Sequence, residues 1–171
     1  MKDDPQEKHK ILMIISCTKT SARERCKAKD MYKGNIFIKA QKLAKFFAFH
    51  TLILSVKYGL IGNEDEIEPY DKTVKDIDIA VVKQINETLK RYILAEDIKT
   101  VIIILGEPYF DIIKEEVILL PKRIKAVRMM GKNYKAYVYK ITQLIRFGEL
   151  YSQKIFSDIK TEKKVSFADL F

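Results

Sequence analysis

The chain alternates short, solid apolar runs with longer stretches in which apolar residues recur every three or four positions. The short runs predict buried strands, at residues 10–16, 51–54 and 99–105. The longer stretches predict helices, at residues 37–49 and 73–94, and a further helix opens at Gly106. Strands that alternate with helices in this way predict an α/β domain of three layers, with helices on both faces of a mostly parallel sheet.

The second half of the chain has a less regular pattern. Residues 122–130 predict a fourth strand, which gives a sheet of about four strands. The alternating segment 134–139, after a Gly-Lys-Asn turn, predicts either one side of a hairpin or the flank of a loop. Helical spacing then predicts a last helix over 141–159. The basic segment 23–32 is expected to be helical in part.

Composition and charge narrow the class of protein. No apolar run approaches the length of a membrane span, and the polar start shows no signal peptide, so we expect a cytoplasmic protein without membrane contact. Lys and Arg number 32 against 23 Asp and Glu, a net charge of +9. This excess favours nucleic acid as a partner. A generic Lys-rich surface, in a composition typical of thermophile proteins, would give the same excess.

Metal ligands and nucleotide-hydrolysis motifs are scarce in the sequence. Cys17, Cys26, His9 and His50 offer too few soft ligands, at the wrong spacing, for a structural zinc site. The hydroxyl-rich turn 16–21 lacks the glycines of a Walker loop, which disfavours nucleotide hydrolysis. We therefore expect no metal and no cofactor.

Polar residues gather where the second predicted strand ends. The strand leads into Ser55, Lys57, Tyr58 and Gly59, and a loop with Pro69, Tyr70 and Asp71 follows. Ligands of α/β proteins bind beyond the carboxyl ends of the strands, so we predict a site here. A buried ion pair between Lys57 and Asp71, with tyrosines packed around it, is the structural alternative.

Two other predicted strands end in residues that suit the same crevice. Ser16, Cys17 and Lys19 follow the first strand and suit a phosphate or a base edge, unless the hydroxyls of this turn only cap the next helix. Gly106 follows the third strand and allows close approach of a ligand to the backbone. If the strands are parallel neighbours, Tyr109 points near the same crevice.

Five motifs carry a resemblance to a known family. They are Ser16-Cys17 with Lys19, the segment 31–37 that contains Tyr32, residues 54–60, residues 67–71 with Thr73, and Gly106 to Tyr109. With these motifs the chain resembles the uncharacterised group related to the peroxide-stress protein YaaA, over roughly residues 11–110. The resemblance implies a uracil-DNA glycosylase-like α/β fold, DNA binding and a role in limiting oxidative DNA damage.

The resemblance also implies roles for individual residues in a DNA glycosylase-like hydrolase of DNA repair. A base flipped out of the stack would enter the pocket. Asp71 would stabilise an oxocarbenium-like sugar or orient water, and Lys57 would neutralise a phosphate or the departing base, or attack the sugar. The residues expected to bind substrate are Ser16, Cys17, Lys19, Tyr32, Ser55, Tyr58, Gly59, Pro69, Tyr70, Gly106 and Tyr109. Two alternatives stay open, a non-catalytic DNA-binding module that protects against stress and an enzyme acting on a nucleotide or an RNA base.

The last eleven residues differ in character from the rest. We expect one domain over residues 1–160 and a flexible tail over 161–171. Lys164, Phe167, Leu170 and Phe171 have the spacing of the box that binds the sliding clamp PCNA. This resemblance implies an archaeal or eukaryotic repair or replication setting. The alternative is a tail that folds back onto its own domain.

Overall fold

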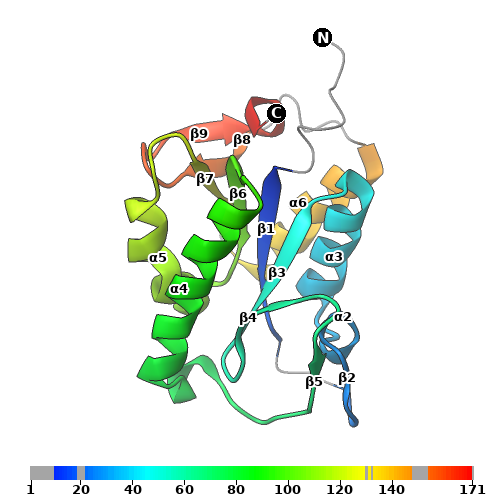
Figure 1. Cartoon of the computed structure of the whole chain (residues 1–171). Helices are drawn as coiled ribbons and strands as arrows, with labels where there is room; N and C mark the ends of the chain where they lie inside the picture. The colour runs from blue at the N-terminus through cyan, green and yellow to red at the C-terminus, as the bar shows by residue number, and fades with distance from the viewer. Residues whose placement is uncertain (1–9, 19–21, 130, 132, 148–153, 171) are drawn as a thin grey trace.

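A seven-stranded sheet forms the centre of the molecule, in the order β4-β3-β1-β6-β7-β8-β9 (Figure 1). The structure is a computed structural model that describes residues 10–18, 22–129, 131, 133–147 and 154–170. The strands are β1 (Ile11–Ser16), β3 (His50–Ser55), β4 (Gly59–Gly62), β6 (Thr100–Ile104), β7 (Lys125–Met129), β8 (Lys154–Asp158) and β9 (Lys164–Ser166).

The four predicted strands form the parallel centre of this sheet. β1 pairs in parallel with β3 and with β6, and β6 pairs in parallel with β7. The prediction of an α/β fold with a mostly parallel centre is therefore confirmed. The expected number of about four strands was wrong, because β4, β8 and β9 add antiparallel strands at the two edges.

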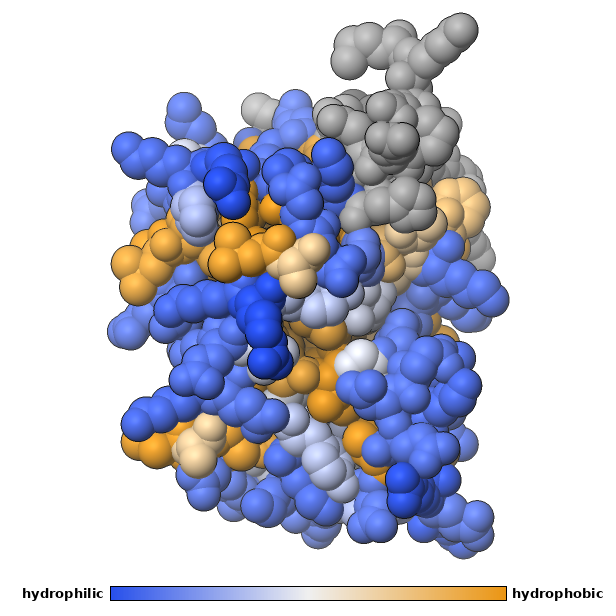
Figure 2. Space-filling model, in the orientation of Figure 1, coloured by the Kyte–Doolittle hydropathy of each residue, from blue (hydrophilic) through white to orange (hydrophobic). Residues whose placement is uncertain are grey.

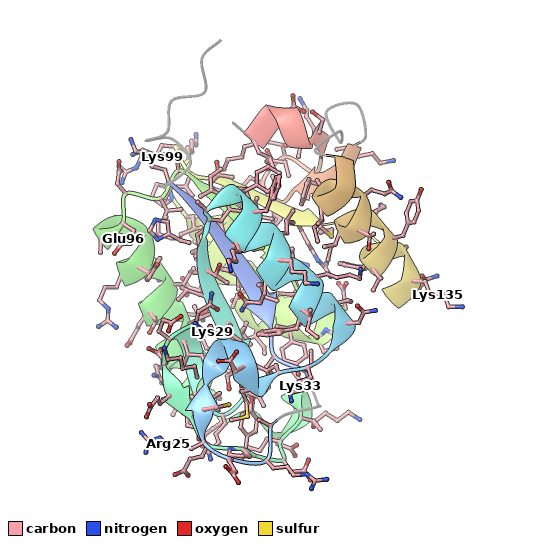
Figure 3. The ribbon with its side chains drawn as sticks, turned by 90° about the vertical axis from the view of Figure 1, so that its right-hand side faces the viewer. Arg25, Lys29, Lys33, Glu96, Lys99 and Lys135 are labelled. Carbon is pink, nitrogen blue, oxygen red and sulfur yellow. The ribbon has the colours of Figure 1, made fainter. Side chains whose placement is uncertain are left out.

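Helices cover both faces of the sheet. On one face α3 (Asn35–Phe47) lies beside α6 (Tyr134–Phe147), as Figure 3 shows, and on the other α4 (Ile79–Ala95) lies beside α5 (Glu107–Leu119). Alternate residues of β1 enter the two cores: Met13 packs in the core that includes α3, and Ile14 in the core that includes α4 and α5. Burial on both faces explains why β1 has a continuous apolar sequence.

The remaining elements are small and lie beside the main sheet. β2 (Cys26–Lys27) pairs with β5 (Glu66–Ile67), and the short helix α2 (Ala28–Met31) follows β2. None of the described helices combines the length and apolarity needed to cross a bilayer. Figure 2 shows a mostly hydrophilic face, with apolar side chains over the end of α5 and the start of α4, where Leu119 and Ile79 are exposed.

The helix predicted over 73–94 begins later than expected. α4 starts at Ile79, because the Asp78 side chain accepts a hydrogen bond from the N–H of Ala80 (2.8 Å) and caps the helix there. Residues Val74–Asp76 form a separate 3-10 turn, η1, in which Thr73 and Asp76 cap each other. The apolar stripe continues across both elements and hides the boundary.

The structure corrects the assignment of residues 134–159. Residues 134–139 are the start of α6 rather than a strand, because the Asn133 side chain accepts a hydrogen bond from the N–H of Ala136 (3.0 Å) and caps the helix. The predicted helix over 141–159 was wrong in its second part, since α6 ends at Phe147 and β8 occupies Lys154–Asp158. The sequence signal for this end is Gly148.

The end of the chain packs on the domain, whereas the sequence analysis expected a flexible tail after residue 160. β9 pairs with β8, and a 3-10 turn, η2 (Phe167–Leu170), follows it. Leu170 is 5% exposed and belongs to the same core as Phe156. Phe171 and the side chain of Phe167 lie outside the described residues, and Lys164 is exposed on β9. Clamp binding stays a prediction, and it would require Leu170 to leave this core.

Replacing Leu170 with Ala should lower the free energy of unfolding by about 2–4 kcal/mol, the usual cost of truncating a buried leucine. Urea denaturation followed by circular dichroism measures this change. The matched control is Leu119→Ala, which truncates a side chain that is 73% exposed and should change stability little. Equal stability of the two variants would show that the end of the chain is not docked in solution.

Candidate functional site

The predicted site residues around Ser55 form a buried, hydrogen-bonded cluster. Ser55 ends β3, and its Oγ accepts the backbone N–H of Lys57 (3.3 Å) and of Tyr58 (3.2 Å). The Tyr70 hydroxyl lies 2.8 Å from Ser55 Oγ and 2.9 Å from the Tyr32 hydroxyl. One serine therefore joins the end of β3, the residue after α2 and the loop before η1. We call Ser55, Tyr32 and Tyr70 the Ser55 cluster.

Burial raises the pKa of both tyrosines of the Ser55 cluster. It raises the pKa of Tyr32 to about 12, and it also raises the pKa of Tyr70, with Cys17 as the next cause. At neutral pH both hydroxyls carry their protons. They act as hydrogen-bonding groups of the cluster and not as bases.

Lys57 and Asp71, the residues of the catalytic hypothesis, have different surroundings in the structure. The Lys57 Nζ lies 4.8 Å from the centre of the Tyr58 ring and 5.8 Å from that of Tyr70, which are cation–π distances. Asp71 is exposed. Among the ion pairs of the described residues none joins Lys57 to Asp71, so the predicted buried ion pair is not observed either.

Gly59 and Pro69 shape the connections around the Ser55 cluster. Gly59 begins β4 with a φ of +77°, a backbone conformation that other residues rarely adopt. Pro69 is half-buried and follows Glu68, whose N–H donates to the Tyr58 hydroxyl at 3.3 Å. Neither residue lines the cleft described next.

A cleft of about 1160 Å³ lies at the carboxyl ends of β1, β6 and β7. Ser16, Gly106 and Tyr109 line it, as the sequence analysis expected of one shared crevice. Lys57, Tyr58, Tyr70 and Asp71 do not line it. The structure thus separates two groups of predicted site residues. Ser16, Gly106 and Tyr109 line this cleft, whereas Ser55, Tyr32 and Tyr70 form the Ser55 cluster.

The cleft lies where the order of the strands reverses. From β1 the chain passes to β3 on one side, and β6 later joins β1 on its other side. The helices that follow β1 and β6 therefore lie on opposite faces of the sheet, and the loops at the two strand ends diverge. Open α/β sheets bind their ligands at this switch point.

A close backbone contact forms one wall of the cleft. The Gly34 N–H donates to Thr18 Oγ1 at 3.1 Å, which joins the loop after β1 to the start of α3. A Cβ at Gly34 would overlap the Thr18 side chain. Glycine is therefore required for the first turn of α3 to reach the cleft.

Arg128 and Glu107 form a charged pair in the cleft that the sequence analysis missed. Arg128 Nη2 donates to Glu107 Oε2 at 2.7 Å, and its guanidinium lies 4.2 Å from the centre of the Phe110 ring. Arg128 holds the pKa of Glu107 below its usual value. A single arginine inside the apolar run of β7 was the available signal.

The amino-terminal half of α6 supplies two further lining residues. Tyr137 donates its hydroxyl proton to the Met129 carbonyl at 3.0 Å, and Lys140 lies one turn farther along the helix. Neither residue was expected at the site, because the alternation over 134–139 indicated a strand or a loop. Burial lowers the pKa of Lys140, and nearby Lys164 lowers it further.

Cys17 connects the Ser55 cluster with the cleft. Its N–H donates to the Leu54 carbonyl at 3.0 Å, and its buried thiol donates to the Tyr109 hydroxyl at 3.6 Å. Lys19 lies outside the described residues. Within the part of the chain that the structure describes, no group of three His, Cys, Asp or Glu residues has the arrangement of a metal site.

Ser55→Ala should lower the free energy of unfolding by roughly 1–3 kcal/mol, because two backbone N–H groups and two tyrosine hydroxyls lose a buried partner. Urea denaturation measures the loss. Ser157→Ala, at a half-buried serine of β8, is the control and should change stability less. If both variants match the unchanged chain, the Ser55 cluster does not stabilise the fold.

A known protein family covers most of this architecture. Residues 12–138 match the model of a family described as a family of unknown function (DUF6884). The match runs from β1 into α6 and includes all three strands whose ends form the cleft. No curated protein and no solved structure matches the chain. The chain belongs to the DUF6884 family of unknown function.

Proposed function

We propose that the domain binds nucleic acid and that the cleft receives one nucleotide unit of the strand. The observation that carries this proposal is the cleft at the strand-order reversal, where aromatic rings and cations occur together. Tyr109 and Tyr137 supply rings, and Arg128, Lys114 and Lys140 supply positive charge. Proteins that bind single strands combine the same two features, rings for the bases and cations for the backbone.

The size and floor of the cleft suit more than an isolated base. Its volume of about 1160 Å³ lies just above the usual range for small-molecule sites. Ile104, Leu105 and Met129 give it an apolar floor. A base could pack on this floor while its sugar and phosphate remain near the charged side chains.

Basic residues continue around the rim of the cleft. Lys33 and Lys135 are exposed and project beside the amino-terminal ends of α3 and α6 (Figure 3). Gly34, next to Lys33, and Asn133, two residues before Lys135, line the cleft. The chain as a whole has a net charge of +9, and these rim lysines favour the phosphates of a strand on either side of the bound nucleotide.

The geometry favours binding over base excision by the residues predicted for it. Lys57 packs on tyrosine rings, and Asp71 is exposed outside the cleft lining. Glycosylase activity, a place in DNA repair, kinship with the YaaA-related group and recruitment by a clamp stay predictions. The family match names no activity that would test them.

Binding to a fluorescein-labelled 12-nucleotide DNA strand tests the proposal, with anisotropy measured at low and moderate salt. The double variant Lys114→Gln/Lys140→Gln should weaken binding roughly 10-fold, because it removes two cations from the cleft. Duplex DNA and an RNA strand of the same sequence show which nucleic acid is preferred.

The matched control is Lys75→Gln/Lys83→Gln, which removes the same charge from exposed positions outside the cleft lining. Equal weakening by the two double variants would mean that the cleft has no special part in binding. Absence of binding to every strand at low salt would show that the proposal is wrong.

A further inference from the structure

We propose that Arg128 is the phosphate-binding residue of the cleft, and that Glu107 occupies its guanidinium until the phosphate of a nucleotide displaces it. This inference rests on the proposed function. It names the group by which the cleft selects its ligand, a phosphate carried by a nucleoside.

Arg128 is held in place before any ligand arrives. It lies on β7 opposite Ile103 of β6, and its guanidinium packs on the Phe110 ring at 4.2 Å. Its side chain is only 18% exposed. A planar guanidinium held in this way can bind two phosphate oxygens without first being ordered.

Glu107 is free to move away from that guanidinium. It is the first residue of α5, and its side chain is 70% exposed although it bonds to Arg128. Most of the Glu107 side chain already lies in water, so moving it away from Arg128 gives up little burial, and the incoming phosphate takes its place on the guanidinium. A phosphate that replaces it keeps a negative charge beside the amino-terminal end of α5.

Arg128 also has a donor that its present contacts leave unused. Its Nε is buried and has no hydrogen-bond partner in the structure. Its Nη2 bonds to Glu107 and lies 3.5 Å from the Leu105 carbonyl. Buried donors are seldom left unpaired. A phosphate has three acceptor oxygens, so it can accept a second hydrogen bond from the guanidinium where the Glu107 carboxylate accepts one.

This competition would make the cleft selective. A neutral nucleoside has no group that can replace the Glu107 carboxylate on Arg128. A ligand carboxylate would exchange one singly charged partner for another. A phosphate gains charge and hydrogen bonds on exchange, so the cleft would prefer nucleotides to nucleosides.

Isothermal titration of the full chain with thymidine and with thymidine monophosphate tests the inference. The unchanged protein should bind the monophosphate more tightly than thymidine. Glu107→Gln should raise affinity for the monophosphate by about 2- to 5-fold and leave thymidine binding unchanged. Arg128→Gln should weaken monophosphate binding by about 10-fold or more. Glu115→Gln, an exposed carboxylate of the same helix outside the cleft lining, is the charge-matched control.

Equal binding of thymidine and its monophosphate by the unchanged protein would overturn this inference and leave the proposed function standing. If Glu107→Gln raises affinity for the monophosphate no more than Glu115→Gln does, phosphate does not displace Glu107 from Arg128. The comparison of these two glutamate variants tests the inference even if Arg128→Gln does not fold. Glu107 is exposed, so its replacement should leave the fold intact. If neither ligand binds and a tetrathymidylate with a 5′-phosphate does not bind either, the proposed function is wrong as well. Tighter binding of this tetranucleotide than of the monophosphate would identify a strand as the source of the phosphate.

Discussion

The parallel pairing of β1 with β3 on one side and β6 on the other is the constraint on which the rest of the structure depends. It buries β1 on both faces and sends the following helices to opposite faces of the sheet. It also brings Ser16 and Gly106, which are far apart in the sequence, to the same cleft. The position of the candidate site thus follows from strand order before any side chain is considered.

Two polar assemblies lie at this edge of the sheet, and their chemistry differs. The Ser55 cluster is buried, its tyrosines are protonated, and its hydrogen bonds join three segments of the chain. The cleft is open and carries the Arg128–Glu107 pair. The dense polar motif around Ser55 therefore forms the hydrogen-bonded Ser55 cluster, which joins parts of the fold. The residues with ligand-binding chemistry are scattered along the chain.

The sequence predicted the parts of the fold that depend on burial. The solid apolar runs of β1, β3 and β6 mark strands covered on both faces, and these three strands were all expected, as was β7 from its less regular pattern. A local cap explains one element that was missed, since Asn133 starts α6 in spite of an alternating pattern. The end of α6 before β8 was also missed, because the helical spacing of apolar residues continues past it.

For the site, the sequence predicted the correct edge of the sheet but only some of the residues. Ser16, Gly106 and Tyr109 line the cleft because each lies at or just after the end of a central parallel strand. Lys57 lies at the turn from β3 into the antiparallel β4 and packs on tyrosine rings instead. Arg128 was missed because strand pairing and the Phe110 ring position it, and neither can be read from the residues next to it.

Mapping by NMR of the nitrogen-15-labelled chain, titrated with a single-stranded oligonucleotide, tests the central claim most directly. Four glycine amides report on the two assemblies. Gly34 and Gly106 line the cleft, whereas Gly59 lies opposite Ser55 in the pairing of β3 with β4, and Gly62 is at the other end of β4. The account predicts that the signals of Gly34 and Gly106 shift with oligonucleotide while those of Gly59 and Gly62 stay in place. Shifts confined to Gly59 and Gly62 would contradict it and return the site to the two loops that carry Lys57 and Asp71.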